Sequence, residues 1–357
     1  MNAPDPQPCH SEWLPLLLRS LQRYASVVRV VIAAVRGSAP REAGASMIVT
    51  PAAAHGTIGG GRLEWEVLRS ARGLLSSDST EALLQKFVLG PQLGQCCGGV
   101  VEVWLERYTS RDSELLTETL RRSQSGRVEL RSTLLKSNSV RRRICMPANS
   151  HIANTARASL QHNDAGEVTL VELLTRPAAL WLYGAGHVGR AVVRIAAELA
   201  WQVTWIDSRA EALTIETGGN IQARCAAEPV ETVQQAPPDS CFLVMTHSHA
   251  LDYALCRAIL SRDYAWAGLI GSNSKSARFR AQLRRDGILA AQVERLVCPV
   301  GIAGIHNKHP TAIAVSVVAQ LLQHFQQAMP LNADLPMPLG ANCVQSCSGC
   351  DNSVVSS

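Results

Sequence analysis

Residues 180–189 read Leu-Trp-Leu-Tyr-Gly-Ala-Gly-His-Val-Gly, and they decide the fold of the second half of the chain. A short apolar run, predicted to be a strand, leads into Gly184, Gly186 and Gly189, and a helical pattern follows from Val188 to Leu199. In such a turn the first glycine allows the tight bend, the second lets a phosphate approach the backbone, and the third packs helix against strand. The segment therefore predicts a Rossmann-like, doubly wound domain.

The sequence after this turn alternates predicted strands and helices, as a doubly wound sheet requires. Asp207 ends the next strand, 18 residues after Gly189, where such domains place the acid that binds a ribose. Strands are predicted at 241–246 and 267–270, and helices at 251–260, at 276–285 and from Pro310 to about 327. We expect this Rossmann-like domain to span residues 179–328. The pattern leaves open whether its turn holds a nicotinamide dinucleotide or another anionic ligand.

The first half of the chain has a mixed α+β pattern, which we assign to an N-terminal domain at residues 11–150. An amphipathic helix is predicted at 11–24 and a second one from the triple glycine to about residue 75. Apolar or β-branched runs predict strands at 27–35, 46–49, 83–89, 100–105 and 128–135. Residues 151–178 are polar and poorly patterned, which predicts a linker. Residues 329–357 predict a disordered tail that contains cysteines.

The composition is that of a folded protein with two domains. The chain has 357 residues, of which 46% are hydrophobic and 18% charged, and this excludes disorder for most of its length. No apolar run reaches the roughly 18 to 20 residues that cross a bilayer. The first eight residues lack the basic and apolar regions of a signal peptide. These features predict a soluble, cytoplasmic protein.

Basic residues are concentrated in one part of the first half. The net charge of +5 is too small to require nucleic acid, yet residues 107–150 hold ten basic and four acidic side chains. This segment ends in the run Arg141, Arg142 and Arg143. It predicts either a solvated face or a docking surface for an acidic partner or an anionic ligand. Nucleic acid is the weakest choice, because no aromatic residues alternate with the basic ones.

A second glycine-rich segment lies in the first half. Gly59, Gly60 and Gly61 precede a predicted helix, and Arg62 follows them. Consecutive glycines remove side chains where a ligand or another backbone segment comes close. The segment predicts either a loop that receives an anion, with Arg62 adding charge, or a packing turn.

The cysteines favour thiol or metal chemistry over a disulfide framework, because the chain has an odd number of them, 11. Cys96 and Cys97 stand beside two glycines, in a turn where a soft metal or a sulfur atom could bind, although two buried thiols would fit the same pattern. Cys343, Cys347 and Cys350 have the spacing C-x3-C-x2-C. That spacing is compatible with an iron–sulfur cluster, a structural metal or free thiols.

Polar residues follow the predicted strand at 241–246. His247, His249 and Asp252 lie at the carboxyl end of that strand, where doubly wound sheets bind ligands. The metallo-hydrolase pattern HxHxDH would need aspartate at 251 and histidine at 252, and neither position has it. We therefore favour contacts from these histidines to a polar ligand over a catalytic metal.

Several segments occur together in an order that points to one family. The chain resembles the XdhC/CoxI family of accessory proteins for molybdenum hydroxylases over about residues 27–325. The resemblance rests on the following segments: Gly37-Ser38-Ala39-Pro40-Arg41 through Gly44, Gly56-Thr57-Ile58-Gly59-Gly60-Gly61-Arg62-Leu63-Glu64, Leu89-Gly90-Pro91 with Gln95-Cys96-Cys97-Gly98-Gly99, Gly184-Ala185-Gly186-His187-Val188-Gly189, Asp207-Ser208-Arg209, Met245-Thr246-His247-Ser248-His249 with Asp252, Gly268-Leu269-Ile270-Gly271-Ser272, and Cys298-Pro299-Val300-Gly301-Ile302.

The resemblance implies a chaperone that binds the molybdopterin form of the molybdenum cofactor and protects it from oxidation. It also implies that the chaperone presents the cofactor to a cysteine desulfurase for sulfuration and inserts it into apo xanthine dehydrogenase. Such proteins are typically homodimers without turnover of their own. We expect the cofactor between the two domains, with Cys96 and Cys97 as its molybdenum or sulfur contact. The cofactor-binding residues so implied are Gly59, Gly60, Gly61, Arg62, Cys96, Cys97, Gly184, Gly186, His187, Gly189, Asp207, His247 and His249.

The chain departs from the family pattern at two positions. The family usually has glutamate where this chain has Ala312, and often where it has Gln320.

The main alternative function is an NAD(P)-dependent oxidoreductase, in which Asp207 would bind a ribose. Against it, the sequence offers no clear proton donor paired with a substrate-anchoring arginine. The third function is a sulfur or iron–sulfur scaffold that uses Cys96, Cys97 and the tail.

Overall fold

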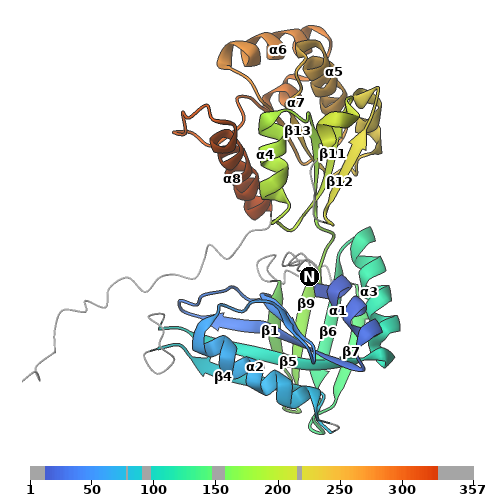
Figure 1. Cartoon of the computed structure of the whole chain (residues 1–357), viewed down its shortest axis with the longest axis vertical. Helices are drawn as coiled ribbons and strands as arrows, with labels where there is room; N and C mark the ends of the chain where they lie inside the picture. Colours follow the sequence, from blue (N-terminus) through green and yellow to red (C-terminus); the bar gives the residue numbers. More distant parts are fainter. Residues whose placement is uncertain (1–12, 78, 91–97, 147–156, 215–218, 329–357) are drawn as a thin grey trace, which may run out of the picture.

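The computed structural model describes residues 13–77, 79–90, 98–146, 157–214 and 219–328. They form two domains, which Figure 1 shows one above the other. The chain passes from one to the other between β9 (Val168–Leu174) and β10 (Ala178–Tyr183). In the described part of the chain, no helix combines the length and apolar character needed to cross a membrane.

The second domain is built on a six-stranded parallel sheet with the strand order β12-β11-β10-β13-β14-β15. Counted from β10, this is the order 3-2-1-4-5-6 of a Rossmann domain, which confirms the predicted doubly wound fold. The strands after β10 are β11 (Trp201–Asp207), β12 (Ile221–Cys225), β13 (Cys241–Val244), β14 (Trp266–Leu269) and β15 (Leu296–Val297). Each predicted strand here is present, and β12 and β15 were not predicted.

Helices cover both faces of this sheet, as the continuous apolar strands require. On one face, α4 (His187–Ala196) and α8 (Pro310–Ala328) pack on the sheet through Val192 and Leu321. On the other face, buried Leu255 and Phe279 come from two further helices. The helices of that face are α5 (His249–Leu260), α6 (Asn273–Arg285), α7 (Ala290–Glu294) and the 3-10 helix η4 (Pro229–Gln235), and η3 (Ala210–Leu213) follows β11.

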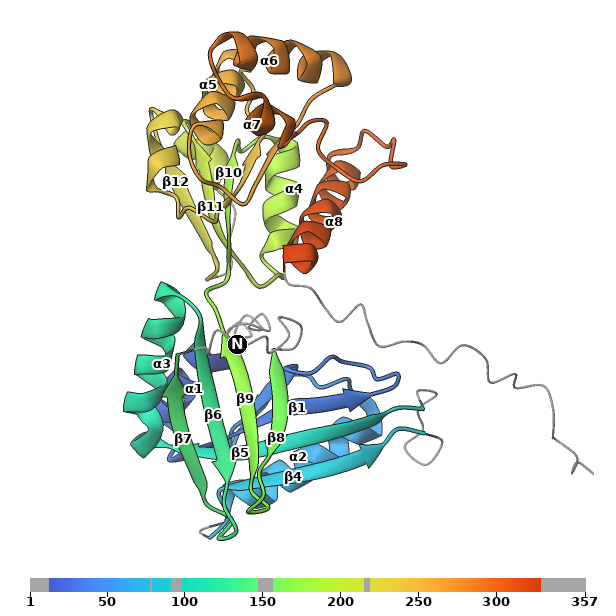
Figure 2. The same ribbon diagram turned by 180° about the vertical axis from the view of Figure 1, so that it is seen from behind.

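The described part of the first domain consists of two stacked antiparallel sheets, three α-helices and one 3-10 helix, and Figure 2 shows the strands of one sheet running across those of the other. The five-stranded sheet has the order β3-β2-β1-β5-β4, and the four-stranded sheet has the order β7-β6-β9-β8. The elements are α1 (Trp13–Arg23), β1 (Ser26–Arg36), β2 (Ser46–Val49), β3 (Ala54–Gly56), α2 (Gly61–Leu75), β4 (Ala82–Val88), β5 (Val100–Thr109), the 3-10 helix η2 (Ser110–Asp112), α3 (Ser113–Ser125), β6 (Val128–Leu134), β7 (Val140–Cys145), β8 (Ala158–His162) and β9.

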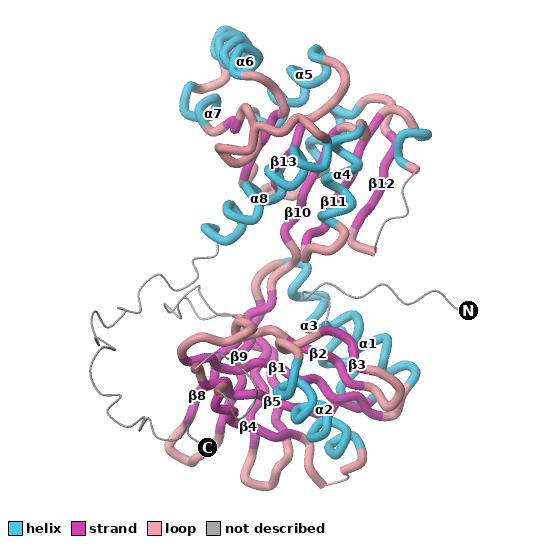
Figure 3. The backbone as a smooth tube through the Cα atoms, turned by 60° about the vertical axis from the view of Figure 1, so that its left-hand side comes forward, coloured by secondary structure: helices cyan, strands magenta, loops and turns pink. Residues whose placement is uncertain are grey.

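The segment 151–178, predicted as a linker, contains two strands of the first domain. β9 pairs with β6 from Val168 opposite Leu134 to Leu174 opposite Val128, and β8 forms the edge of the same sheet beside β9. β8 is short and its last two residues, Gln161 and His162, are exposed, so its sequence lacks an apolar pattern. The chain that joins the two domains is therefore short, from residue 175 to residue 177, and the separation into two bodies is plain in Figure 3.

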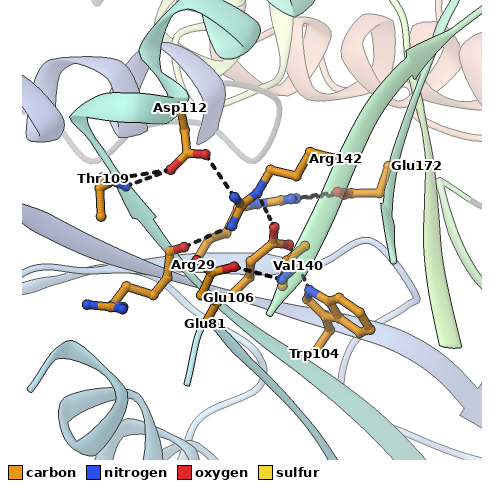
Figure 4. Close-up of polar contacts among 10 residues, drawn as sticks. Arg29, Glu81, Trp104, Glu106, Thr109, Asp112, Val140, Arg142 and Glu172 are labelled. Atoms are coloured by element: carbon orange, nitrogen blue, oxygen red, sulfur yellow. Dashed lines mark hydrogen bonds and ion pairs between the residues drawn. The ribbon is translucent and has the colours of Figure 1, made fainter. Parts of the chain in front are cut away.

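A buried network of charges fastens the two sheets of the first domain together (Figure 4). Arg29 of β1 forms two hydrogen bonds of 2.7 Å with Glu172 of β9, and both residues are almost fully buried. The Arg29 guanidinium also lies over the Trp13 ring, 3.4 Å from its centroid. Burial alone would lower the pKa of Arg29, but the Glu172 carboxylate raises it above its ordinary value, so the guanidinium keeps its charge.

The basic run at the end of segment 107–150 divides between the core and the surface. Arg142 turns inward from β7, donates to Glu106 of β5 and to Asp112, and lies 4.5 Å from the Tyr108 ring centroid. Arg141 and Arg143 point to the opposite face of the strand and are exposed. The run therefore contributes one charge to the buried network and two to an edge strand, in line with the period of two in a strand.

Candidate functional site

The glycine-rich turn between β10 and α4 uses its three glycines for different reasons. A Cβ on Gly184, which has φ +117°, would lie 2.3 Å from the Met245 carbonyl oxygen. A Cβ on Gly189 would lie 2.1 Å from the Gly184 carbonyl oxygen. A Cβ on Gly186, in contrast, would meet no atom within 4 Å. The first and third glycines are therefore required by close packing, whereas the space beside the middle one is open to a ligand.

A hollow of about 550 Å³ opens in front of this turn. It lies at the carboxyl ends of β10, β13 and β14, where doubly wound sheets bind ligands, and the amino end of α8 closes one side. Four of its lining residues, His187, Arg190, Arg209 and His247, have basic side chains. Together with the amino end of α4, where backbone N–H groups favour negative charge, they make this pocket suited to an anionic group.

The pocket belongs to the second domain alone. All the described residues that line it lie between Gly184 and Pro310. Because β10 begins at the junction with the first domain and all six strands are parallel, their carboxyl ends point away from that domain (Figure 1), and the residues that line the pocket follow those ends. This pocket therefore does not lie between the two domains of one chain, where the cofactor was expected.

Asp207, at the end of β11, is 5% exposed and holds the turn in place. Its Oδ2 accepts a hydrogen bond of 2.7 Å from the Ala185 backbone N–H, and Arg209 donates to both carboxylate oxygens. Burial raises the pKa of Asp207, but the hydrogen bonds from Arg209 and from two backbone N–H groups outweigh it and lower the pKa below its ordinary value. Asp207 is thus an ionised, fully engaged acid beside the pocket.

The turn after β13 is fixed by a buried ion pair. Asp252 accepts hydrogen bonds from the Thr246 backbone N–H and hydroxyl, and Lys275 donates to it over 2.6 Å. The Lys275 ammonium also donates to the Ile270 carbonyl, so it joins the ends of β13 and β14. This arrangement presents His247 to the pocket, while His249 is exposed at the start of α5 and is not among the lining residues. Across the described residues, no group of three His, Cys, Asp or Glu side chains could hold a metal.

The turn after β15 is anchored on α8, which accounts for one of the two departures from the family pattern. The Gln320 side-chain oxygen accepts a hydrogen bond of 2.8 Å from the Gly301 backbone N–H. Ser316 accepts a second hydrogen bond, from the Ile302 backbone N–H. A carbonyl oxygen of glutamine can accept this bond as a carboxylate would, so the anchor does not need a charge at position 320. Nothing in the structure explains Ala312.

The segment that ends in the triple glycine binds a carboxylate from the helix that follows it. Glu64 Oε2 accepts hydrogen bonds from the Thr57 hydroxyl and from the Ile58 and Gly60 backbone N–H groups. These donors therefore already serve an internal anion. Open space remains beside Gly60 and Gly61, both of which have positive φ, and exposed Arg62 pairs with Glu66 at 3.0 Å.

Three segments of the first domain that are distant in sequence meet at this place. A Cβ on Gly59 would lie 2.6 Å from the Pro40 ring, and a Cβ on Gly99 would lie 2.2 Å from the Ser38 carbonyl oxygen. The triple glycine, the turn after β1 and the start of β5 are therefore in contact. Cys96 and Cys97 directly precede Gly98 in the sequence but lie outside the described residues. The tail cysteines Cys343, Cys347 and Cys350 also lie outside them.

Sequence reasoning missed four side chains that shape these sites, namely Arg190, Arg209, Lys275 and Glu64. Arg190 directly follows the glycine motif, so its place one turn into α4 was a usable signal. Glu64 stands in the glycine-rich segment itself, four residues after Gly60, a spacing that brings a helix side chain back to its own amino end. Lys275 gave no signal, because its partner Asp252 is 23 residues away in another element.

Comparison with family models finds two matches, in the order of the two domains. A model described as the XdhC and CoxI family matches residues 20–87. A model described as the XdhC Rossmann domain matches residues 180–321.

Comparison with individual proteins gives similarities of different extent. A protein of Bacillus subtilis, described as a probable subunit of xanthine dehydrogenase, is 24% identical over 324 residues, which cover 85% of this chain and 94% of that protein. Uncharacterized protein YqeB of Escherichia coli is 33% identical over 147 residues, which cover 40% of this chain and 27% of that protein, so the chain spans about a quarter of that relative.

One solved structure has the same fold over nearly the whole chain. A crystal structure described as a xanthine dehydrogenase from Bacillus halodurans matches with a TM-score of 0.72 and 21% identity, covering 88% of this chain and 96% of that one. At 21% identity the match supports the fold alone. It supports the same two-domain organisation, with a Rossmann domain following the mixed first domain.

Proposed function

Because the chain belongs to the XdhC and CoxI family, we propose that it is a molybdenum cofactor-binding chaperone for a molybdenum hydroxylase. In this proposal it carries the molybdopterin form, protects it from oxidation and presents it to a cysteine desulfurase for sulfuration. It then inserts the cofactor into apo xanthine dehydrogenase, a recipient suggested by the names of a curated relative and of a solved structure with this fold. We further propose that it works as a homodimer and as a maturation factor without turnover of its own.

The observation that carries the proposal is the open space beside Gly186, within a pocket ringed by basic side chains. Molybdopterin ends in a phosphate, and a phosphate needs a close approach to backbone N–H groups at a helix start. In this proposal Gly184, Gly186 and Gly189 form the turn that receives the phosphate. His187, His247 and Arg190 surround it, and Asp207 holds the turn in shape.

The first domain is assigned a separate part in the same function. The molybdenum centre of the cofactor, when bound, supplies a soft, sulfur-binding site, and Cys96 and Cys97 are the thiols suited to meet it. The contact between the turn after β1, the triple glycine and Gly99 supports a common site at this place, and we propose that Gly59, Gly60, Gly61 and Arg62 act in it together with the thiols. We propose that the pocket serves carriage and the thiols serve sulfuration, in successive steps.

A second candidate function is an NAD(P)-dependent oxidoreductase, because the strand order and the glycine turn are those of dinucleotide-binding domains. The hydrogen bonds at Asp207 count against an enzyme that uses NAD, and the sequence offers no clear proton donor paired with a substrate-anchoring arginine for either dinucleotide. Both carboxylate oxygens already accept donors from this chain, so a ribose diol would have to displace Arg209. We therefore keep the chaperone as the favoured function.

Replacing Gly186 by alanine tests the pocket without disturbing the fold. The residue has an extended backbone conformation and open space around it, so we expect the free energy of unfolding to fall by at most about 1 kcal/mol. The new methyl group would stand where the phosphate approaches, and cofactor retention should fall at least about tenfold. Retention is measured as pterin bound per chain after anaerobic loading and gel filtration. Wild-type retention in Gly186→Ala would remove the pocket from the proposal.

Replacing Cys96 and Cys97 by alanine, singly and together, tests the thiol assignment. We expect weaker retention of the cofactor or slower sulfuration, because a methyl group cannot contact molybdenum or sulfur as a thiolate does. Cofactor content and the activity of reconstituted xanthine dehydrogenase are the two readouts, and circular dichroism checks the fold. Cys225→Ala is the matched control, since Cys225 is an exposed cysteine of β12. Normal loading and sulfuration by both single variants and the double variant would show the assignment to be wrong.

A further inference from the structure

Asp207 is the residue at which a Rossmann pocket ordinarily recognises a ribose, and here its carboxylate is saturated. Oδ1 accepts hydrogen bonds from the Arg209 backbone N–H at 3.0 Å and from Arg209 Nε at 2.9 Å. Oδ2 accepts from the Ala185 backbone N–H at 2.7 Å and from Arg209 Nη2 at 3.0 Å. A carboxylate offers about four lone-pair positions, so no acceptor is left for the two hydroxyl groups of a ribose.

The group that saturates Asp207 is itself placed for ligand contact. The Arg209 side chain is 42% exposed and lines the pocket, whereas Asp207 lies beneath it. Within the described residues Arg209 uses Nε and Nη2 toward Asp207, and no hydrogen bond of Nη1 occurs. The rim of the pocket therefore presents a guanidinium where a pocket selective for a ribose diol presents a carboxylate. Guanidinium groups bind phosphate oxygens through paired N–H donors.

We propose that Arg209 determines the ligand class of this pocket: it bars a free ribose diol from Asp207 and selects a ligand that carries a phosphate monoester. The recognised chemistry is the phosphate dianion, whether it is attached to a pterin or to the 2′ position of a ribose. Arg190, whose Nε donates to the Ala212 carbonyl, stands on the same pocket and adds to its positive charge. The inference rests on the proposed function only in taking the pocket as the binding site.

The test uses ligands that contain no molybdenum. The full-length wild-type chain, Arg209→Ala and Arg209→Lys are titrated with NADPH, which carries a 2′-phosphate, and with NADH, which carries a free diol. Nicotinamide fluorescence reports binding. We expect the wild type to bind NADPH at least about ten times more tightly than NADH, since one charge-assisted contact accounts for about that ratio. In Arg209→Ala the preference should reverse, because the alanine removes the cation and uncovers the Asp207 carboxylate.

Two variants and a competitor sharpen the result. Arg209→Lys keeps the charge but not the paired donors, so its preference should fall between those of the wild type and Arg209→Ala. Arg257→Ala removes an exposed charge of α5 away from the pocket and should leave the wild-type preference unchanged. Inorganic phosphate is added as a competitor. Phosphate competes at the glycine turn with the pyrophosphate of both dinucleotides, but at Arg209 only with the 2′-phosphate of NADPH. It should therefore lower the preference of the wild type for NADPH over NADH.

The inference is overturned if the wild type binds NADH as tightly as NADPH, if Arg209→Ala leaves the preference unchanged, or if neither dinucleotide binds any of the three proteins. It is also overturned if inorganic phosphate leaves the wild-type preference for NADPH over NADH unchanged. These results are independent of the molybdenum cofactor. A chain that carries no cofactor but keeps the NADPH preference would contradict the proposed function and leave this inference standing.

Discussion

Replacing Arg29 by methionine is expected to lower the free energy of unfolding of the first domain by about 3–5 kcal/mol. The substitution removes the cation that faces Glu172, and both side chains are almost completely shielded from water. The carboxylate of Glu172 would then be buried without its partner, which costs more than the lost pair contributed. Urea unfolding, followed by hydrogen exchange of peptides from β1 and β9, measures the change for this domain alone.

Two comparisons decide whether the buried pair is the cause. The double substitution Arg29→Met and Glu172→Leu removes both charges and should recover most of the lost stability. Arg36→Met is the matched control on the same strand, because Arg36 is 73% exposed and stands 3.8 Å from Glu102, so its effect should stay below about 1 kcal/mol. If Arg29→Met is no more harmful than Arg36→Met, the network in Figure 4 does not join the sheets as described.

The second large effect is expected in the Rossmann domain. Replacing Gly184 by alanine places a Cβ 2.3 Å from a backbone oxygen, at a φ of +117° that residues with side chains rarely adopt. The carbonyl of Met245 belongs to the neighbouring strand end and cannot move without breaking the turn that presents His247. We expect the second domain to lose at least about 3 kcal/mol and the pocket to lose its ligand.

The comparison with Gly186→Ala separates fold from binding. Both substitutions add one methyl group to the same turn, but only the one at Gly184 meets a backbone atom. Gly184→Ala should therefore unfold the second domain early, with the first domain unchanged in hydrogen exchange, while Gly186→Ala should keep the fold and lose the ligand. Equal thermal stability of the two variants would contradict the assignment of separate roles to the two glycines.

The fold of the second domain could be predicted because its signals are local. The strand, glycine turn and helix from residue 180 to residue 199 follow each other directly, and a parallel sheet gives continuous apolar strands. β12 was missed because its burial pattern has exposed residues after Ile221, as an edge strand has. In the first domain, β8 and β9 were placed in a linker. The edge strand β8 carries polar residues, and the pairing that makes β9 a strand of this sheet cannot be seen in its own sequence.

Residues of the candidate site could be predicted from the sequence where a local motif marked them, but not where their partners are distant in the sequence. The residues of the glycine turn and His247 were predicted from the motif and line one pocket, whereas His249 is exposed and does not line it. Arg29 shows the limit of such reasoning, since it interrupts an apolar strand and its partner lies 143 residues away. Arg209, in contrast, stands two residues after Asp207, so its contact with that acid could have been predicted from the sequence.

The central claim is that this chain carries the molybdenum cofactor, and cofactor content tests it most directly. The full-length protein is purified without oxygen from cells able to make molybdopterin, the bound pterin is oxidised to its fluorescent form, and molybdenum is measured in the same sample. We predict close to one pterin and one molybdenum per chain. A preparation that holds neither, and that takes up none when cofactor is added, would contradict the account.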